Sequence, residues 1–249
     1  MRSNNPVLSD QAFESVYTPT DPRAHAHLMT VAGTVNKTLI LLALVVASAA
    51  VTWTQIATSP ILMPAVIGAS LLGLVVALVT IFKPQWAPFT SPVYALLEGV
   101  VLGGLSAVFN YRYPGIVPQA VGLTLATLFS LLFAYQAGLI RASENFVRGV
   151  VAATMAIFVV YLVSMVLGFF NVRIPLIHEA GSIGIAFSLF VVAVAALNLV
   201  LDFDFIERGS RHGLPKHMEW YGAFGLVVTL VWLYLEMLRL LAKIRDYTR

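Results

Sequence analysis

Long runs of apolar residues alternate with short polar stretches from residue 38 onward. Seven runs approach or exceed the roughly 20 residues that a helix needs to cross a bilayer; they cover residues 38–55, 61–82, 92–107, 117–140, 147–170, 184–206 and 218–241. The runs are continuous, and a helix satisfies its own backbone hydrogen bonds in lipid. The pattern therefore predicts an all-α integral membrane protein with a bundle of seven transmembrane helices.

Polar stretches rich in Pro, Gly or charge separate the runs and should end each helix. The third run is the weakest because Glu98 interrupts it and Asn110 ends it, and the alternative to seven spans is that one of the runs is only a re-entrant hairpin. Gly99 and Gly103 in this run form a small-xxx-small face that would let another helix approach closely. The expected organisation is a polar N-terminal tail over 1–37, a membrane domain over 38–241 and a basic tail over 242–249.

Composition agrees with a membrane protein. The chain is 59% hydrophobic and 11% charged, whereas soluble domains carry about a quarter charged residues. Its formal net charge is +3, but the bases lie in loops and tails, which favours bilayer orientation over nucleic-acid binding. No cysteine is present, so disulfides, thiolate metal sites and thiol catalysis are excluded.

Lysine and arginine near the ends of the runs predict a cytoplasmic N-terminus. With that orientation the opposite side receives few bases in its loops, namely Arg112 and Arg173, together with a C-terminal group. The cytoplasmic side would hold Arg2, Arg23, Lys37, Lys83, Arg141, Arg148, Arg208, Arg211 and Lys216. The C-terminal group opposes this orientation because an odd number of spans places it outside; it consists of Arg239, Lys243, Arg245 and Arg249.

Four carboxylates interrupt the apolar runs. They are Glu98 in the third run, Asp202 and Asp204 in the sixth, and Glu236 in the seventh, with Asn198 one turn before Asp202. An ionisable residue at the centre of a span costs roughly 2.5–3.5 kcal/mol on insertion scales and indicates a functional site by default. Carboxylates without a buried base need a proton, a cation, water or hydrogen-bond donors, so these residues are candidate sensors of pH or cations.

Helix rise gives the depth of each carboxylate. Glu98 lies about 10 Å into its run, and Asp202 lies about 10 Å from the same membrane side. Glu236 lies about 28 Å along its helix, too deep to meet Asp202 unless the helix begins outside the bilayer, tilts or kinks. The arithmetic therefore favours Glu98 as the neighbour of Asp202.

Each carboxylate also has a purely structural interpretation. Asp204 would mark the end of its span, and Glu98 could lie at the headgroup boundary. Glu236 could reach the membrane surface or pair with Arg239 at the i,i+3 spacing.

Several segments resemble the Bax inhibitor-1 (transmembrane BAX inhibitor motif) family. LNLVLDFDFIERG and LVWLYLEMLRLL resemble its sixth and seventh helices, and MRSNNPVLS and YALLEGVVLGGLS resemble its bacterial branch. The resemblance implies a seven-helix bundle with the last helix central, in the bacterial plasma (inner) membrane. It also implies a pH-sensitive calcium leak governed by two aspartates that share a proton when the pore is closed. These positions fall on Asp202 and on Glu236, where glutamate keeps the carboxyl and adds one methylene.

The leading functional hypothesis is a calcium leak gated by protonation. Asp202 and Glu236 would form the proton- and calcium-sensing pair, with Glu98, Asp204 and Asn198 in support. Calcium would be a permeant or bound ion, and no tightly bound cofactor is expected. Expected partners are the lipid bilayer, calcium or protons, and membrane proteins, but not nucleic acid.

Two other functions remain open. One is an adaptor that regulates a membrane protease or another membrane complex, with structural carboxylates; the other is a proton-coupled transporter. An enzyme is not expected because no P-loop or dinucleotide fingerprint occurs. All histidines lie in tails or loops, at His25, His27, His178, His212 and His217.

Overall fold

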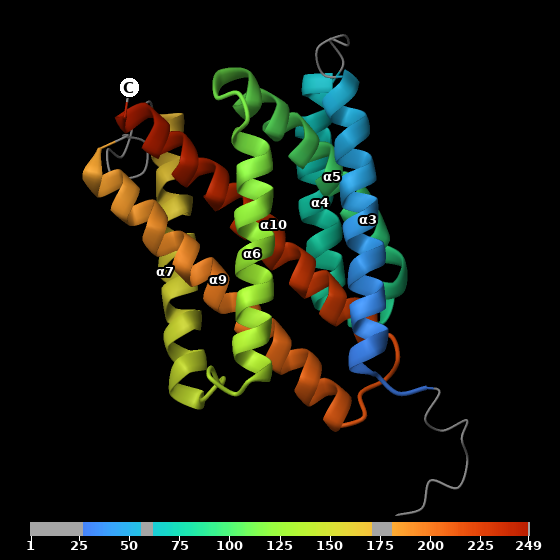
Figure 1. Cartoon of the computed structure of the whole chain (residues 1–249). Coiled ribbons are helices and arrows are strands. Elements are labelled where there is room, and N and C mark those ends of the chain that lie inside the picture. Colours follow the sequence, from blue (N-terminus) through green and yellow to red (C-terminus); the bar gives the residue numbers. More distant parts are fainter. Residues whose placement is uncertain (1–26, 56–61, 171–180, 249) are drawn as a thin grey trace, which may run out of the picture.

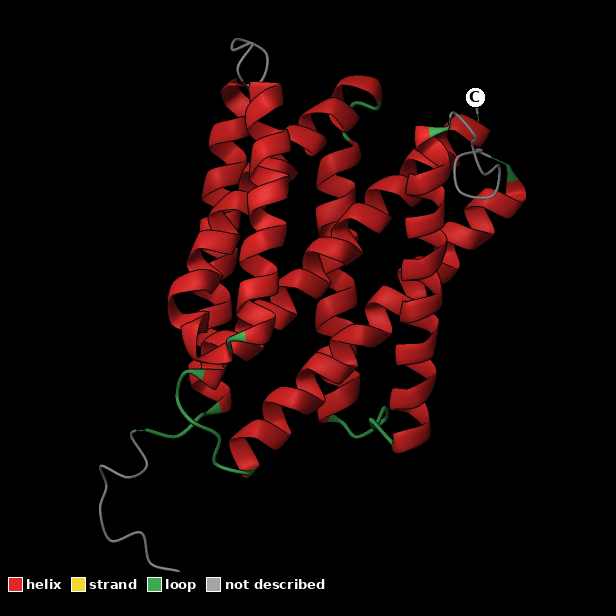
Figure 2. Cartoon of the chain, turned by 180° about the vertical axis from the view of Figure 1, so that it is seen from behind, coloured by secondary structure: helices red, strands yellow, loops and turns green. Residues whose placement is uncertain are grey.

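A computed structural model describes residues 27–55, 62–170 and 181–248. Within these ranges seven long α-helices are apolar enough to cross a membrane, which confirms the predicted bundle (Figures 1 and 2). The helices are α3 (Val31–Gln55), α4 (Leu62–Phe82), α5 (Ala87–Arg112), α6 (Ile116–Gln136), α7 (Glu144–Phe169), α9 (Ser182–Arg211) and α10 (Met218–Tyr247). A short 3-10 helix, η2 (Pro84–Trp86), leads into α5. Of the polar tail predicted over 1–37, residues 1–26 lie outside the described residues.

Successive helices run up and down between two ends of the bundle. We call the end where α3, α5, α7 and α10 begin the proximal end, and the other the distal end (Figure 1). The third predicted run is a continuous helix of 26 residues, so no re-entrant hairpin forms there. Helices also extend beyond the apolar runs: α3 begins at Val31, and α10 continues to Tyr247 through most of the predicted basic tail. Hydropathy marks only the lipid-facing part of a helix, whereas backbone hydrogen bonding continues past it.

Local chemistry explains where individual helices begin and end. Ser143 caps α7 by accepting a hydrogen bond from the Phe146 amide, and Glu144 follows in the first turn, where its charge suits the helix dipole. Between α5 and α6, Gly115 adopts a φ of 79°, a left-handed conformation that favours glycine. Its amide donates to the Asn110 side chain over 3.0 Å, which fixes this turn.

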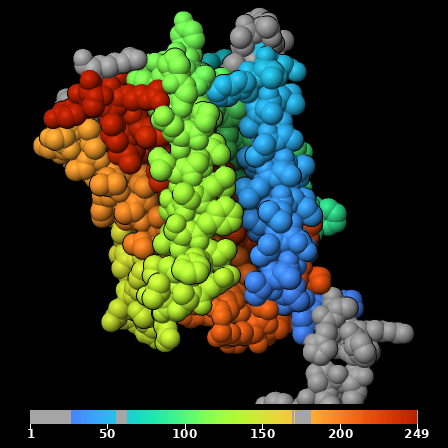
Figure 3. All heavy atoms as spheres, viewed as in Figure 1, coloured from blue at the N-terminus to red at the C-terminus, as the bar shows by residue number. Residues whose placement is uncertain are grey.

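Helix α10 is the central element of the bundle, as the family resemblance implies. In its most apolar stretch 61% of the residues are buried, against 11% in α7. It packs against α9, α3, α6 and α5. In the space-filling view α6 and α3 cover most of α10, whose C-terminal end emerges at the upper left (Figure 3). Most of the apolar stretch of α10 is therefore covered by neighbouring helices.

Glycines in α5 bring it into close contact with α3. A Cβ on Gly99 would lie 2.5 Å from the Val45 carbonyl oxygen, and a Cβ on Gly103 would overlap the Ala49 carbonyl oxygen. Any larger side chain would push the two backbones apart. The small-xxx-small face predicted from the sequence thus serves the α3–α5 contact.

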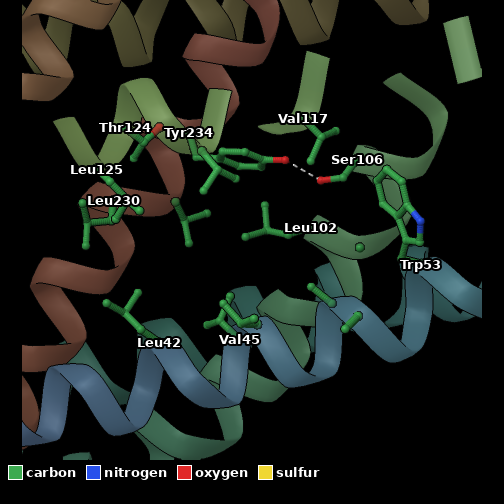
Figure 4. A pocket seen from close by; sticks show the side chains of 16 residues that line it. Leu42, Val45, Trp53, Leu102, Ser106, Val117, Thr124, Leu125, Leu230 and Tyr234 are labelled. Carbon is green, nitrogen blue, oxygen red and sulfur yellow. Dashed lines mark hydrogen bonds between the residues drawn. The ribbon is translucent and has the colours of Figure 1, made fainter. Parts of the chain in front are cut away.

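An apolar pocket of about 320 Å³ lies between α3, α5, α6 and α10 (Figure 4). The Ser106 and Tyr234 hydroxyls, which line it, form a hydrogen bond of 2.6 Å. The Thr124 hydroxyl donates to the Ala120 carbonyl in its own helix. These hydroxyls satisfy one another or the backbone, so the pocket presents an apolar surface.

Candidate functional site

Asp202 lies on α9, where the apolar part of the helix ends. Its Oδ2 atom is buried and has no hydrogen-bond partner among the described residues. Within the same residues no lysine, arginine or histidine forms an ion pair with it. A buried polar atom without a partner is rare in proteins and costs roughly 1–3 kcal/mol or more, so Asp202 is the strongest candidate for a functional group in this chain.

Asp202 lines a pocket of about 830 Å³ between α4, α5, α9 and α10, which we call the carboxylate pocket. Glu98 of α5 lines the same pocket. The pocket contains no basic side chain; its lining consists of Ser70, Leu71, Leu74, Ala77, Ile81, Tyr94, Glu98, Asn198, Leu201, Asp202, Phe205, Tyr221, Gly222, Phe224, Gly225, Val228 and Thr229. Two carboxyls therefore face one cavity with no protein cation to neutralise them.

Glu98 is held between its own helix and α4. The Tyr94 side chain, one turn earlier on α5, lies next to the Glu98 carboxyl. A Cβ on Gly73 of α4 would lie 3.9 Å from Glu98 Oε2, so the glycine leaves room for the carboxylate. Glu98 thus lies between α5 and α4, where it faces the carboxylate pocket.

Helix α10 forms the wall opposite Asp202. Gly225 has no side chain, and a Cβ there would lie 3.7 Å from Asp202 Oδ1. The Thr229 side chain, one turn further, also lies beside the carboxyl. The central helix therefore meets Asp202 about 10–16 Å from its start at Met218, at the same level as Glu98.

Asn198 lines the carboxylate pocket one turn before Asp202, on the face expected from the sequence. Its amide nitrogen donates to the Thr154 hydroxyl over 2.8 Å and to the Val194 carbonyl over 2.9 Å. These bonds fix the amide and join α9 to α7. Asn198 thus provides a fixed polar neighbour for Asp202.

Asp204 lies on a different face of α9. It forms an ion pair of 2.8 Å with Arg208, one turn later. Both line a separate pocket at the proximal end with Glu207, Arg211 and the α6–α7 connection. This environment fits the structural interpretation of Asp204 as a residue at the end of the span.

Glu236 is 1% exposed but does not line the carboxylate pocket. Its Oε1 accepts a hydrogen bond of 2.6 Å from Arg239, and both oxygens lie 3.1 Å from the Tyr161 hydroxyl. Glu236 follows Thr229 by seven residues, or about 10 Å along α10. The structure therefore places Asp202 and Glu98 in the lining of one pocket, and it places Glu236, the partner of Asp202 by resemblance, in a separate network that contains a base.

A calcium site built from Asp202 and Glu236 would need both carboxyls in one cavity, and this structure does not bring them there. No group of three or more His, Asp or Glu side chains in the described part of the chain could hold a metal ion. Calcium takes six to eight oxygen ligands. Asp202, Glu98, Asn198 and Thr229 supply some oxygens in the carboxylate pocket, so a passing hydrated cation fits it better than a resident one.

Sequence reasoning missed several residues of these sites. Gly225 and Thr229 were missed because a glycine and a threonine on an apolar helix carry no charge signal. Tyr161 was missed for a similar reason, since a tyrosine in a span is usually a packing residue. These residues are distinguished only by lying next to a buried acid of another helix. Which helices lie side by side is a property of the fold.

The chain was compared with family models, curated proteins and solved structures. The model of the family described as Bax inhibitor 1 like matches residues 5–246, nearly the whole chain. The searches of curated proteins and of solved structures gave no match. The match covers all seven helices, including the segments around Asp202 and Glu236. The chain therefore belongs to the Bax inhibitor 1 like family.

Proposed function

We propose that this protein is a calcium leak of the membrane, controlled by protonation of Asp202 together with Glu98. The observation that carries the proposal is the buried Oδ2 of Asp202, which has no partner among the described residues and lies in a pocket without a base. An uncompensated ionised carboxylate in such a place is unfavourable. A proton or a cation relieves the cost.

Competition between these two ligands would make the leak pH-sensitive. Calcium prefers oxygen ligands, and ionised carboxylates attract it most strongly. When Asp202 and Glu98 hold protons they are neutral and give a cation nothing to bind. Calcium flux should therefore rise with pH as the carboxyls ionise.

The proposal assigns the second carboxyl to Glu98 instead of Glu236. Glu236 already has Arg239 and the Tyr161 hydroxyl as partners, so its charge is balanced without calcium. The family resemblance assigns the second carboxyl to Glu236. A glutamate side chain is one methylene longer than the aspartate of the family, and Glu236 is already paired with Arg239. Glu98 and Asp202 share the cavity that a cation would enter.

The test is calcium flux into liposomes that contain the purified protein and a calcium-sensitive dye, measured across a range of pH. Asp202→Asn replaces the carboxylate by a neutral group of the same shape and should remove most of the flux and its pH dependence. Glu98→Gln should weaken both. Asp204→Asn is the matched control, since it removes an aspartate two residues away that already pairs with Arg208.

Two outcomes would contradict the proposal. Equal loss in Asp202→Asn and Asp204→Asn would mean that α9 merely needs its acids to fold. Flux that is pH-dependent in Asp202→Asn and Glu98→Gln but not in Glu236→Gln would return the role to the Glu236 network. A wild-type protein without flux would favour the adaptor function, and saturable solute uptake driven by a pH gradient would favour the transporter.

A further inference from the structure

A second polar pocket lies near the distal end of the bundle, away from Asp202. It has a volume of about 630 Å³ and is lined mainly by α7, α9 and α10. Its polar side chains are Tyr161, Ser164, Ser188, Arg239 and Lys243. We call it the basic pocket, because it holds two cations and no carboxylate in its lining.

Arg239 and Lys243 occupy one face of α10, four residues apart. Arg239 uses one nitrogen to bind Glu236 and lies with its guanidinium 5.3 Å from the centre of the Tyr161 ring. A guanidinium has five N–H groups, so further donors remain. Its side chain is 48% exposed, which leaves them accessible from the pocket.

Lys243 donates to uncharged oxygens. Its ammonium group lies 3.0 Å from the Gly184 carbonyl oxygen and 2.8 Å from the Ser188 hydroxyl. Across the described ranges no carboxylate is within ion-pair distance of it. An ammonium has three donors, so one is left for another ligand.

Among the described residues, the charges of this region do not balance. Glu236 offsets one cation, and like charges one turn apart on a helix repel each other. Gly184 and Ser188 belong to the first two turns of α9, whose N-terminal dipole end adds positive potential. In the described part of the chain, two cations and a helix N-terminus therefore face one cavity near a single carboxylate.

The depth of the pocket suits an anion at the membrane surface. Arg239 and Lys243 belong to the last three turns of α10, which runs obliquely to the distal end of the bundle (Figure 1). Ser164 and Gly168 belong to the last two turns of α7. The pocket is thus at the level of lipid headgroups on the distal side.

We propose that the basic pocket binds a phosphate-type oxyanion through Lys243 and Arg239. Such an anion accepts charge-assisted hydrogen bonds from both cations, and the serine and tyrosine hydroxyls around it can donate as well. It can be the headgroup of an anionic phospholipid or a free phosphate ion. Bound there, it would join α7, α9 and α10 at the distal end.

The experiment is native mass spectrometry of the full-length protein with phosphatidylglycerol and, separately, phosphatidylcholine of the same chain length. A parallel arm follows thermal unfolding in lipid-free detergent with added inorganic phosphate. Lys243→Gln should weaken binding of the anion about tenfold, the loss of one charge-assisted bond. Lys243→Arg keeps the charge and should retain binding, which separates a lost site from a misfolded protein.

Arg245→Gln is the matched control. Arg245 lies two residues further on α10 and donates instead to the Pro114 carbonyl and the Gln119 side chain. Selective retention of phosphatidylglycerol that falls only in Lys243→Gln supports a lipid headgroup site; stabilisation by inorganic phosphate with the same dependence supports a free-ion site. Equal retention of both lipids without stabilisation by phosphate, or equal losses in Lys243→Gln and Arg245→Gln, would overturn the proposal.

Discussion

Glu219, at the start of α10, shows how a buried charge is satisfied in this protein. Its side chain is 0% exposed, and it accepts hydrogen bonds from the Thr30 amide and hydroxyl and from Lys37, at 3.0, 2.9 and 2.5 Å. A Cβ on Gly33 would overlap its carboxyl. Asp202 has none of these cationic partners. Glu219 is therefore a carboxylate that joins parts of the fold, whereas Asp202 is available to a ligand.

Replacing Glu219 by glutamine should destabilise the protein. The change leaves Lys37 without its carboxylate and weakens two hydrogen bonds between α10 and the segment before α3, at a cost of about 1–3 kcal/mol. Thermal unfolding of the purified protein in detergent measures the effect. Glu144→Gln is the control, because Glu144 forms an exposed i,i+4 pair with Arg148 and should cost less than about 1 kcal/mol. Similar shifts in both variants would show that the Glu219 contacts contribute little.

At the level of elements, the connection between α9 and α10 holds the segment that precedes α3. The Met29 amide donates to the Leu214 carbonyl over 2.7 Å, and the Lys216 amide donates to the His27 carbonyl over 2.9 Å. The N-terminal segment thus pairs with the α9–α10 connection. Helices α3 and α5 complete this side of the bundle through the glycine contact at Gly99 and Gly103.

Adding one methyl group at Gly103 should disturb the α3–α5 contact. The new Cβ would overlap the Ala49 carbonyl oxygen, a backbone atom that cannot rotate away, and overpacking of this kind costs about 1–3 kcal/mol. Gly103→Ala should therefore lower the unfolding temperature. Gly122→Ala is the matched control, since nothing lies within 4 Å of a Cβ at that position of α6. A variant at Gly103 as stable as the one at Gly122 would contradict the close contact.

For the whole molecule, three of the four C-terminal bases are held by contacts within the bundle, and Arg249 lies outside the described residues. Arg239 pairs with Glu236, Lys243 binds α9, and Arg245 binds the α5–α6 turn and α6. These three bases are held by contacts within the bundle, whereas the positive-inside rule concerns lysine and arginine in the loops that flank the spans. The loop bases alone then decide the orientation that we propose.

Single cysteines can test this orientation because the chain contains none. We expect Leu139→Cys, in the α6–α7 connection, to react with a membrane-impermeant thiol reagent only after the cytoplasmic side is opened. Tyr111→Cys, at the distal end, should react in intact cells. Both side chains are well exposed, at 76% and 93%, so access and not burial decides the result. The reverse labelling pattern would invert the proposed orientation.

The sequence by itself determined the class of the fold and much of its architecture. Continuous apolar runs predict seven helices, because a single segment that crosses lipid can satisfy its backbone hydrogen bonds only as a helix. The depth of Glu98 and Asp202 also follows from sequence, since helix rise is constant. Several helices extend beyond their runs, and α5 and α9 do so at both ends, because hydropathy does not mark where a helix ends in water.

Only the tertiary structure decided which carboxyls line the same pocket. Hydropathy fixes neither the rotation nor the tilt of a helix, which depend on packing against its neighbours. That packing places Asp202 and Glu98 in the lining of one pocket with Gly225 and Thr229, and it turns Glu236 toward Tyr161 and Arg239. A linear sequence shows each acid at its depth, but its neighbours across the bundle come from distant helices, as Glu98 does, which precedes Asp202 by 104 residues.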